Sequence, residues 1–159
     1  MEKCVNVVIA GLGGQGIITA SDILAEAAFR AGHDVKKSEL HGMSQRGGSV
    51  SSDVRFGPVV LSPMVPRGEA DFLVVLAPDQ VEPNRHRLRP GGVLIPPDAV
   101  DESALQNRRS LAVALLGALS ARLRELPEKD FLDALLANLP EKLHEANKQA
   151  FAVGRKSVK

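Results

Sequence analysis

The chain has 159 residues, 44% of them hydrophobic, so it is long enough to bury a core. Its charges nearly cancel, with 20 Lys and Arg against 19 Asp and Glu, which excludes a generally basic surface for nucleic acid. Five Phe and no Trp or Tyr leave an aliphatic core and few rings that stack on bases.

The single cysteine, Cys4, cannot form an internal disulfide, a CxxC redox pair or an iron–sulfur cluster within this chain. The N-terminus has no signal-peptide pattern, and no apolar run reaches the roughly 18 residues of a membrane span. We therefore expect a cytoplasmic protein with neither nucleic acid nor membrane as a partner. Basic clusters at 85–89 and 108–109 are typical of solvated surface.

The first forty residues predict a strand, a glycine turn, a helix and a second strand. Residues 5–10 (VNVVIA) are mostly apolar and β-branched, which is typical of a strand buried on both faces. From Gly16 apolar residues recur at steps of three and four until Gly32, a plausible helix stop. A short strand is expected at 34–39, and such a crossover is right-handed and joins parallel strands.

The middle of the chain predicts a hairpin and two further strands. Residues 50–56 alternate between apolar and polar, which indicates a strand with one wet face. Gly57-Pro58 is a turn signal, and residues 59–61 are expected to return as the partner strand. Residues 71–77 and 93–95 predict two more buried strands.

From residue 110 onward the pattern is helical. Leucines recur every four residues over 111–123, and two more helical stripes cover 128–139 and 141–151 on either side of Pro140. The tail, 154–159, is expected to fray.

Together these elements predict one α/β domain over residues 1–159. It should have three layers, with a mixed, mainly parallel sheet and a helical C-terminal part. The sequence shows no internal repeat and no linker.

The string GLGGQG at 11–16 matches the G-x-G-x-x-G pattern of dinucleotide-binding turns. Gly11 would permit a tight turn, Gly13 the close approach of a ligand, and Gly16 close packing of helix on strand. The helix N-terminus offers N–H groups to an anion, and Glu39 is a candidate for the acid that binds a ribose. The same glycines also suit a purely structural turn, and both interpretations stand.

Two observations weaken the dinucleotide interpretation. A dehydrogenase needs a catalytic half, for which 159 residues with a helical tail leave little room. Gln15 is also unusual, because its amide is expected to point to where phosphates would lie, or to donate a hydrogen bond across an interface.

The second unusual string is HGMSQRGGSV at 41–50. His41 supplies an imidazole of the kind that serves as a general acid or base, Arg46 suits bidentate contact with a carboxylate or phosphate, and Gly47-Gly48 lets a ligand approach the backbone. Parallel strands end at one edge of a sheet, so this loop is expected beside the glycine turn. A plain polar loop is the alternative. No second histidine or carboxylate has metal-ligand spacing here, so we expect no metal site.

Taken together, residues 5–57 resemble the gamma-type domain of the 2-oxoacid:ferredoxin oxidoreductases. Within that family, HGMSQRGGSV is similar to the small subunits of the indolepyruvate branch. The resemblance continues through SPMVPRGEADFLVVLAP, LRPGGVLI and LLGAL, and so covers nearly the whole chain.

The resemblance implies an enzyme that oxidatively decarboxylates 2-oxoacids, here indolepyruvate or other arylpyruvates, to acyl-coenzyme A and passes electrons to ferredoxin. It implies that a large alpha subunit carries thiamine diphosphate and the iron–sulfur clusters. This chain would then be inactive alone and bind no cofactor by itself, with coenzyme A expected in the complex. The expected partners are the alpha subunit, the 2-oxoacid and, through the complex, ferredoxin.

The resemblance also assigns site residues to the two motifs. Catalytic roles fall on His41, Gln45 and Arg46. Cofactor-binding roles fall on Gly11, Gly13, Gly14, Gln15, Gly16, Gly47 and Gly48.

The chain departs from the family after GGVLIPP. The segment 98–109 is short, which suggests that one sheet strand is missing, and Ala112 stands where the family often has Asn. Two alternatives therefore stay open: a stand-alone NAD- or FAD-binding Rossmann-like module, and a non-catalytic paralogue that only binds partners.

Overall fold

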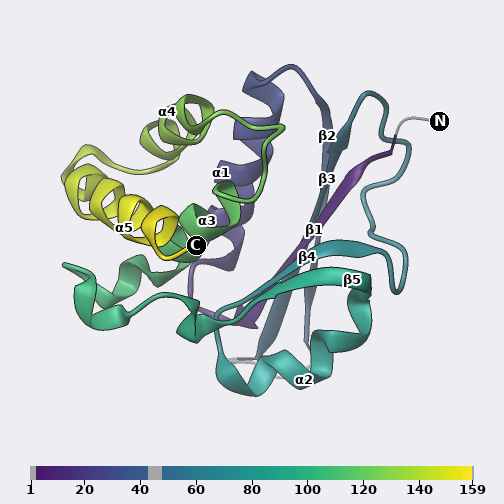
Figure 1. Ribbon diagram of the computed structural model, residues 1–159, viewed down its shortest axis with the longest axis horizontal. Coiled ribbons are helices and arrows are strands. Elements are labelled where there is room, and N and C mark those ends of the chain that lie inside the picture. The colour runs from purple at the N-terminus through teal and green to yellow at the C-terminus, as the bar shows by residue number, and fades with distance from the viewer. Residues whose placement is uncertain (1–2, 43–47, 159) are drawn as a thin grey trace.

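A computed structural model describes residues 3–42 and 48–158 (Figure 1). Its sheet has five strands in the order β2-β3-β1-β4-β5. The strands are β1 (Val5–Leu12), β2 (Asp34–His41), β3 (Ser49–Gly57), β4 (Ala70–Val75) and β5 (Leu88–Ile95). β1 pairs in parallel with β4, and β4 with β5, whereas β3 is antiparallel to both β1 and β2. Four strands thus share one direction, which confirms the mixed, mainly parallel sheet.

Helices cover the two faces of the sheet unequally. Four helices lie together on one face, as Figure 1 shows: α1 (Ile17–Arg30), α3 (Leu111–Ser120), α4 (Glu128–Asn138) and α5 (His144–Lys156). The short α2 (Val81–Asn84) and the segment 58–69 cover the other face, where Val65 and Val81 pack on the sheet. The three layers and the helical C-terminal part are as the sequence predicts.

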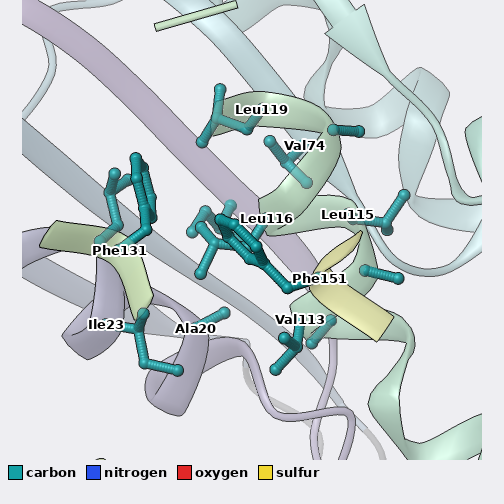
Figure 2. Packing of buried hydrophobic residues seen from close by; sticks show 14 of the residues in the cluster. Ala20, Ile23, Val74, Val113, Leu115, Leu116, Leu119, Phe131 and Phe151 are labelled. Carbon is teal, nitrogen blue, oxygen red and sulfur yellow. The ribbon is translucent and has the colours of Figure 1, made fainter. Parts of the chain in front are cut away.

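β1 is buried on both faces because its side chains alternate between two cores. Val7 and Ile9 belong to the large core under the helices, and Val8 and Ala10 belong to the small core on the other face. In the large core, aliphatic and phenyl side chains from α1, α3, α4 and α5 pack together (Figure 2). The apolar run of β1 is the signature of such a central strand.

The predicted hairpin is wrong. Residues 59–61 form no strand, and β3 instead inserts between β1 and β2. The predicted wet face of β3 is also wrong, because the segment 58–69 folds over it. Asp53 of β3 is buried there, where it accepts a hydrogen bond from the Val65 N–H at 2.9 Å and pairs with Arg87 at 2.8 Å.

The segment between β5 and α3 consists of three 3-10 turns and contains no strand: η3 (Pro97–Ala99), η4 (Glu102–Ala104) and η5 (Arg108–Ser110). The prediction of a frayed tail is wrong for residues 154–156, since α5 runs to Lys156 and Gly154 is buried; Lys159 lies outside the described residues. Within the ranges 3–42 and 48–158, no helix combines the length and apolarity needed to cross a membrane.

The contact between α3 and α5 depends on two glycines. A Cβ added to Gly154 would overlap the Ala114 carbonyl oxygen, and one added to Gly117 would overlap that of Phe151. We predict that Gly154→Ala lowers the free energy of unfolding by about 3 kcal/mol, because the clash with fixed backbone outweighs alanine's helix propensity. Urea denaturation measures the change. Lys148→Ala, on the exposed side of α5, is the control and should change stability little; equal stability of the two variants would contradict the close contact.

Candidate functional site

The turn between β1 and α1 is closed by the side chain of Gln15. Its Oε1 accepts a hydrogen bond from the Leu12 N–H at 2.7 Å, and its Nε2 donates to the Leu76 carbonyl oxygen at 3.3 Å. The amide therefore uses both its acceptor and a donor inside the chain, and ties the turn to the residue that follows β4. Both bonds lie within this chain, and the prediction that Gln15 donates a hydrogen bond across an interface stays a prediction.

The glycines of the turn have roles that differ from those the motif suggests. A Cβ on Gly11 would lie 2.7 Å from Gln15 Oε1 and 2.8 Å from Ile17 Cδ1, so any larger residue here would have to displace the ends of these two side chains. Gly14 and Gly16 have φ of +88° and +85°, the left-handed conformation that side chains disfavour. An added Cβ on Gly16 would make only an ordinary contact, so the last glycine is needed for conformation rather than for packing.

A cavity of about 670 Å³ opens beside this turn. It is lined by Gly14, Gln15, Gly16, Leu76, Pro78, Glu102, Arg108, Arg109 and Leu111. The cavity thus meets the first residues of both α1 and α3, and neither helix has an acidic residue in its first turn or a side-chain cap. Helix N-termini carry partial positive charge, and within the described residues Arg108 and Arg109 form no ion pair. The surroundings favour an anion despite the one carboxylate, Glu102.

The described ends of the second loop lie beside the glycine turn. The Gly13 N–H donates to the Gly48 carbonyl oxygen at 2.9 Å, and the Gly42 N–H donates to that of Ser49 at 2.6 Å. A second cavity, of about 260 Å³, is lined by Leu12, Gly13, Gly14, Gly16, Ile17, Ile18, Thr19, His41 and Val50. The structure therefore brings His41 and Gly48 to the turn, whereas Gln45, Arg46 and Gly47 lie outside the described residues.

Glu39 does not occupy the position of a ribose-binding acid. β3 separates β2 from β1, so Glu39 is two strands, or roughly 10 Å, from the strand that leads into the turn. Its carboxylate instead bonds to Lys37 Nζ, which also contacts Asp22 at 2.7 Å. Burial alone would lower the pKa of Lys37, but the hydrogen bonds to Asp22 and Glu39 outweigh it and raise that pKa. The geometry thus disfavours the dinucleotide interpretation.

Sequence reasoning did not select Arg108 and Arg109 as candidate site residues, because it treated them as surface; both are exposed, and both line the larger cavity. A signal was present: the pair lies directly before the apolar helix α3, whose first turn meets the end of β4. Within the described residues, no three side chains of the metal-ligating types gather to hold a metal ion.

The bonds of Gln15 make a stability prediction. Gln15→Ala leaves the Leu12 N–H without its acceptor, and we expect the free energy of unfolding to fall by about 1–2 kcal/mol. Thermal and urea unfolding measure the loss. Gln106→Ala is the matched control, because that glutamine is exposed and its side chain makes no hydrogen bond in the described part of the chain. A Gln15→Ala variant as stable as the control would show that the hydrogen bonds of Gln15 do not stabilise the turn.

Comparison with known proteins identifies the family of this chain and shows relatives with the same fold. The family model of the pyruvate ferredoxin/flavodoxin oxidoreductases matches residues 6–104. The chain is 40% identical over 144 residues to indolepyruvate oxidoreductase subunit IorB of Thermococcus kodakarensis, covering 87% of this chain and 66% of that protein. It is 39% identical, with the same coverage, to the subunit of that name from Pyrococcus horikoshii. The chain thus spans slightly less than two thirds of these relatives' length.

Solved structures share the fold. The gamma subunit of keto/oxoacid ferredoxin oxidoreductase from Geobacter sulfurreducens matches with a TM-score of 0.81 at 23% identity, over 98% of this chain and 96% of that chain. The 2-oxoglutarate:ferredoxin oxidoreductase of Magnetococcus marinus, solved with 2-oxoglutarate, coenzyme A and succinyl-CoA bound, matches with a TM-score of 0.83 at 21% identity. That match covers 99% of this chain and 31% of that chain. The match of residues 6–104 shows that this chain belongs to the pyruvate ferredoxin/flavodoxin oxidoreductase family.

Proposed function

We propose that residues 1–159 form one gamma-type domain, the small subunit of a 2-oxoacid:ferredoxin oxidoreductase that acts on indolepyruvate or related arylpyruvates. The observation that carries the proposal is the 40% identity, over 87% of this chain, to a protein named indolepyruvate oxidoreductase subunit. The second loop supports the same branch of the family, since its sequence, HGMSQRGGSV, is similar to that of indolepyruvate-type subunits.

The chemistry of this reaction requires a partner. Oxidative decarboxylation uses thiamine diphosphate to stabilise the carbanion and iron–sulfur clusters to carry electrons to ferredoxin. One cysteine cannot ligate a cluster, so we assign these cofactors to a large alpha subunit. A single unpaired thiol also suits a reducing compartment, and we place the complex in the cytoplasm.

We further propose that the 670 Å³ cavity holds phosphate groups of coenzyme A in that complex. Arg108 and Arg109 can bind phosphate in bidentate fashion, and the first turns of α1 and α3 add N–H donors. The glycine turn lets a ligand approach its backbone at Gly14 and Gly16. Coenzyme A supplies the thiol that accepts the acyl group, so these residues would position it without taking part in bond making.

Catalytic contacts are proposed for the second loop. His41 lies at the smaller cavity, where its imidazole can serve as a general acid or base. Arg46 suits the carboxylate of the 2-oxoacid, and Gln45 can donate a hydrogen bond to its carbonyl oxygen. Gly47 and Gly48 would let the loop approach the partner closely.

The structure of the segment between β5 and α3 supports one alternative function. Between β5 and α3 the chain has 3-10 turns in place of a strand, so a non-catalytic paralogue that only binds partners is the second candidate. A stand-alone dinucleotide module is disfavoured by the position of Glu39.

Reconstitution tests the proposal. We expect the purified chain alone to reduce neither ferredoxin nor methyl viologen with indolepyruvate and coenzyme A, and to support that reduction once an indolepyruvate-type alpha subunit is added. Pyruvate and 2-oxoglutarate serve as control substrates. In the same complex, Arg46→Ala should lower turnover without changing assembly.

Three outcomes would contradict this. Activity of the chain alone would remove the need for a partner. A stable complex that turns over no 2-oxoacid would favour the non-catalytic paralogue, and equal turnover of pyruvate would contradict the arylpyruvate assignment.

The coenzyme A cavity makes a separate kinetic prediction. Each charge-assisted contact is worth about 1.5 kcal/mol, so Arg108→Ala and Arg109→Ala should each raise the KM for coenzyme A about tenfold. The KM for the 2-oxoacid should not change. Arg124→Ala, an exposed arginine outside the cavity, is the control. An unchanged KM for coenzyme A would show that the cavity does not hold its phosphates.

A further inference from the structure

Within residues 3–42 and 48–158, no strand pairs with the outer edge of β2. The sheet order places β2 at one end, and all of its residues from Asp34 to His41 pair with β3 in one unbroken register. Proteins guard edge strands with charged side chains, proline, bulges or short length, because an edge presents unpaired N–H and C=O groups. β2 is eight residues long and has no proline or bulge, so its backbone is a regular template for another strand, and its charged side chains restrict which strand can pair with it.

The register shows which residues face outward. The Gly42 N–H donates to the Ser49 carbonyl oxygen, so these two form a hydrogen-bonded pair of the antiparallel ladder. Such pairs alternate with pairs whose backbone groups point away from each other. The N–H and C=O groups that face the open edge therefore belong to Val35, Lys37, Glu39 and His41.

We propose that β2 pairs antiparallel with β2 of a second copy of this chain, about a two-fold axis at Ser38, joining the two sheets into one. In this register Val35 lies opposite His41, and Lys37 opposite Glu39, of the other copy. Every outward-facing residue then finds a hydrogen-bonding partner, and opposite charges face each other twice. Cross-strand pairs of opposite charge stabilise a sheet.

Charge excludes the neighbouring registers. A shift of two residues in one direction would place Lys37 opposite Lys37, and a shift in the other would place Glu39 opposite Glu39. Like charges directly opposite each other destabilise a strand pair, and shifts of one residue misalign the outward-facing groups. The centre at Ser38 is the register that satisfies both the hydrogen bonds and the charges.

Exposed apolar side chains border the same edge. Leu40 of β2 is 67% exposed and would lie across from the aliphatic stem of Lys36 of the other copy. On α1, Ile18 and Phe29 are 38% and 72% exposed, and they share a helical stripe with Asp22, which reaches Lys37. This stripe therefore faces the open side of β2, where a second copy would shield it from water.

Analytical ultracentrifugation of the chain alone tests the pairing. We expect a concentration-dependent equilibrium between the 16.9 kDa chain and its dimer. Lys37→Glu and Glu39→Lys each place like charges opposite one another, so each should weaken the dimer about tenfold or more. An equimolar mixture of the two variants should dimerise again, because Lys37 then faces Glu39, and Lys at 39 faces Glu at 37, across the two chains.

Two further variants serve as controls. Lys36→Glu makes the same charge change on the opposite face of β2, where no charge is opposite, and should leave the dissociation constant within about threefold. Glu39→Pro removes an N–H that faces outward, so the monomer should keep its circular dichroism spectrum while the dimer is lost.

A chain that stays monomeric up to about 200 µM would overturn the proposal. So would a dimer that resists Glu39→Pro, or variants that fail to recover on mixing although each is folded by circular dichroism. If the chain alone is monomeric and Glu39→Pro blocks only assembly with the alpha subunit, that subunit covers the edge instead. These measurements use no substrate, so their outcome is separate from that of the proposed function.

Discussion

β3 lies between β1 and β2 and pairs with both along their length, and the rest of the structure depends on this insertion. It moves β2 to the edge of the sheet and takes Glu39 away from the glycine turn. It also brings the start of β3 to the end of β1, so that Gly48 bonds to Gly13. A βαβ unit with adjacent strands would have left a crevice for a ribose at the point that β3 now occupies.

A second constraint on the structure is the pair of hydrogen bonds by which Gln15 holds the glycine turn in place. Its amide fixes the turn to the end of β4, so the backbone of Gly14 and Gly16 has one defined shape at the cavity. A rigid turn, two helix N-termini and two arginines suit an anion better than they suit an extended dinucleotide. The proposed coenzyme A contacts follow from this chemistry and not from the fingerprint alone.

The proposed site and the outer edge of β2 are neighbouring surfaces that meet at His41, the last residue of β2, which also lines the smaller cavity. The glycine turn and the second loop form the edge that we assign to the alpha subunit and coenzyme A. The outer edge of β2 is available to a second copy through backbone groups and the alternation of Lys37 and Glu39. If both assignments hold, the small subunit joins two catalytic units through one continuous sheet.

Local signals determined most elements. The apolar run of residues 5–10, the helical period after Gly16 and the leucines of α3 each record burial along one element, and the structure confirms them. The two motifs determined where the candidate site lies, because strand ends share an edge of the sheet. The two motifs also indicated the family, because their sequences are specific.

Only tertiary structure decided how the elements pair and what each site residue does. Alternation in residues 50–56 indicated a wet face, but the segment 58–69 that follows β3 and the more distant Arg87 bury Asp53. Gln15 turned inward because Leu76, 61 positions away, supplies its acceptor. Arg108 and Arg109 line the larger cavity because α3 packs beside β4. The hydrophobic periodicity of a sequence indicates which residues are buried, but it does not indicate which distant residues they contact.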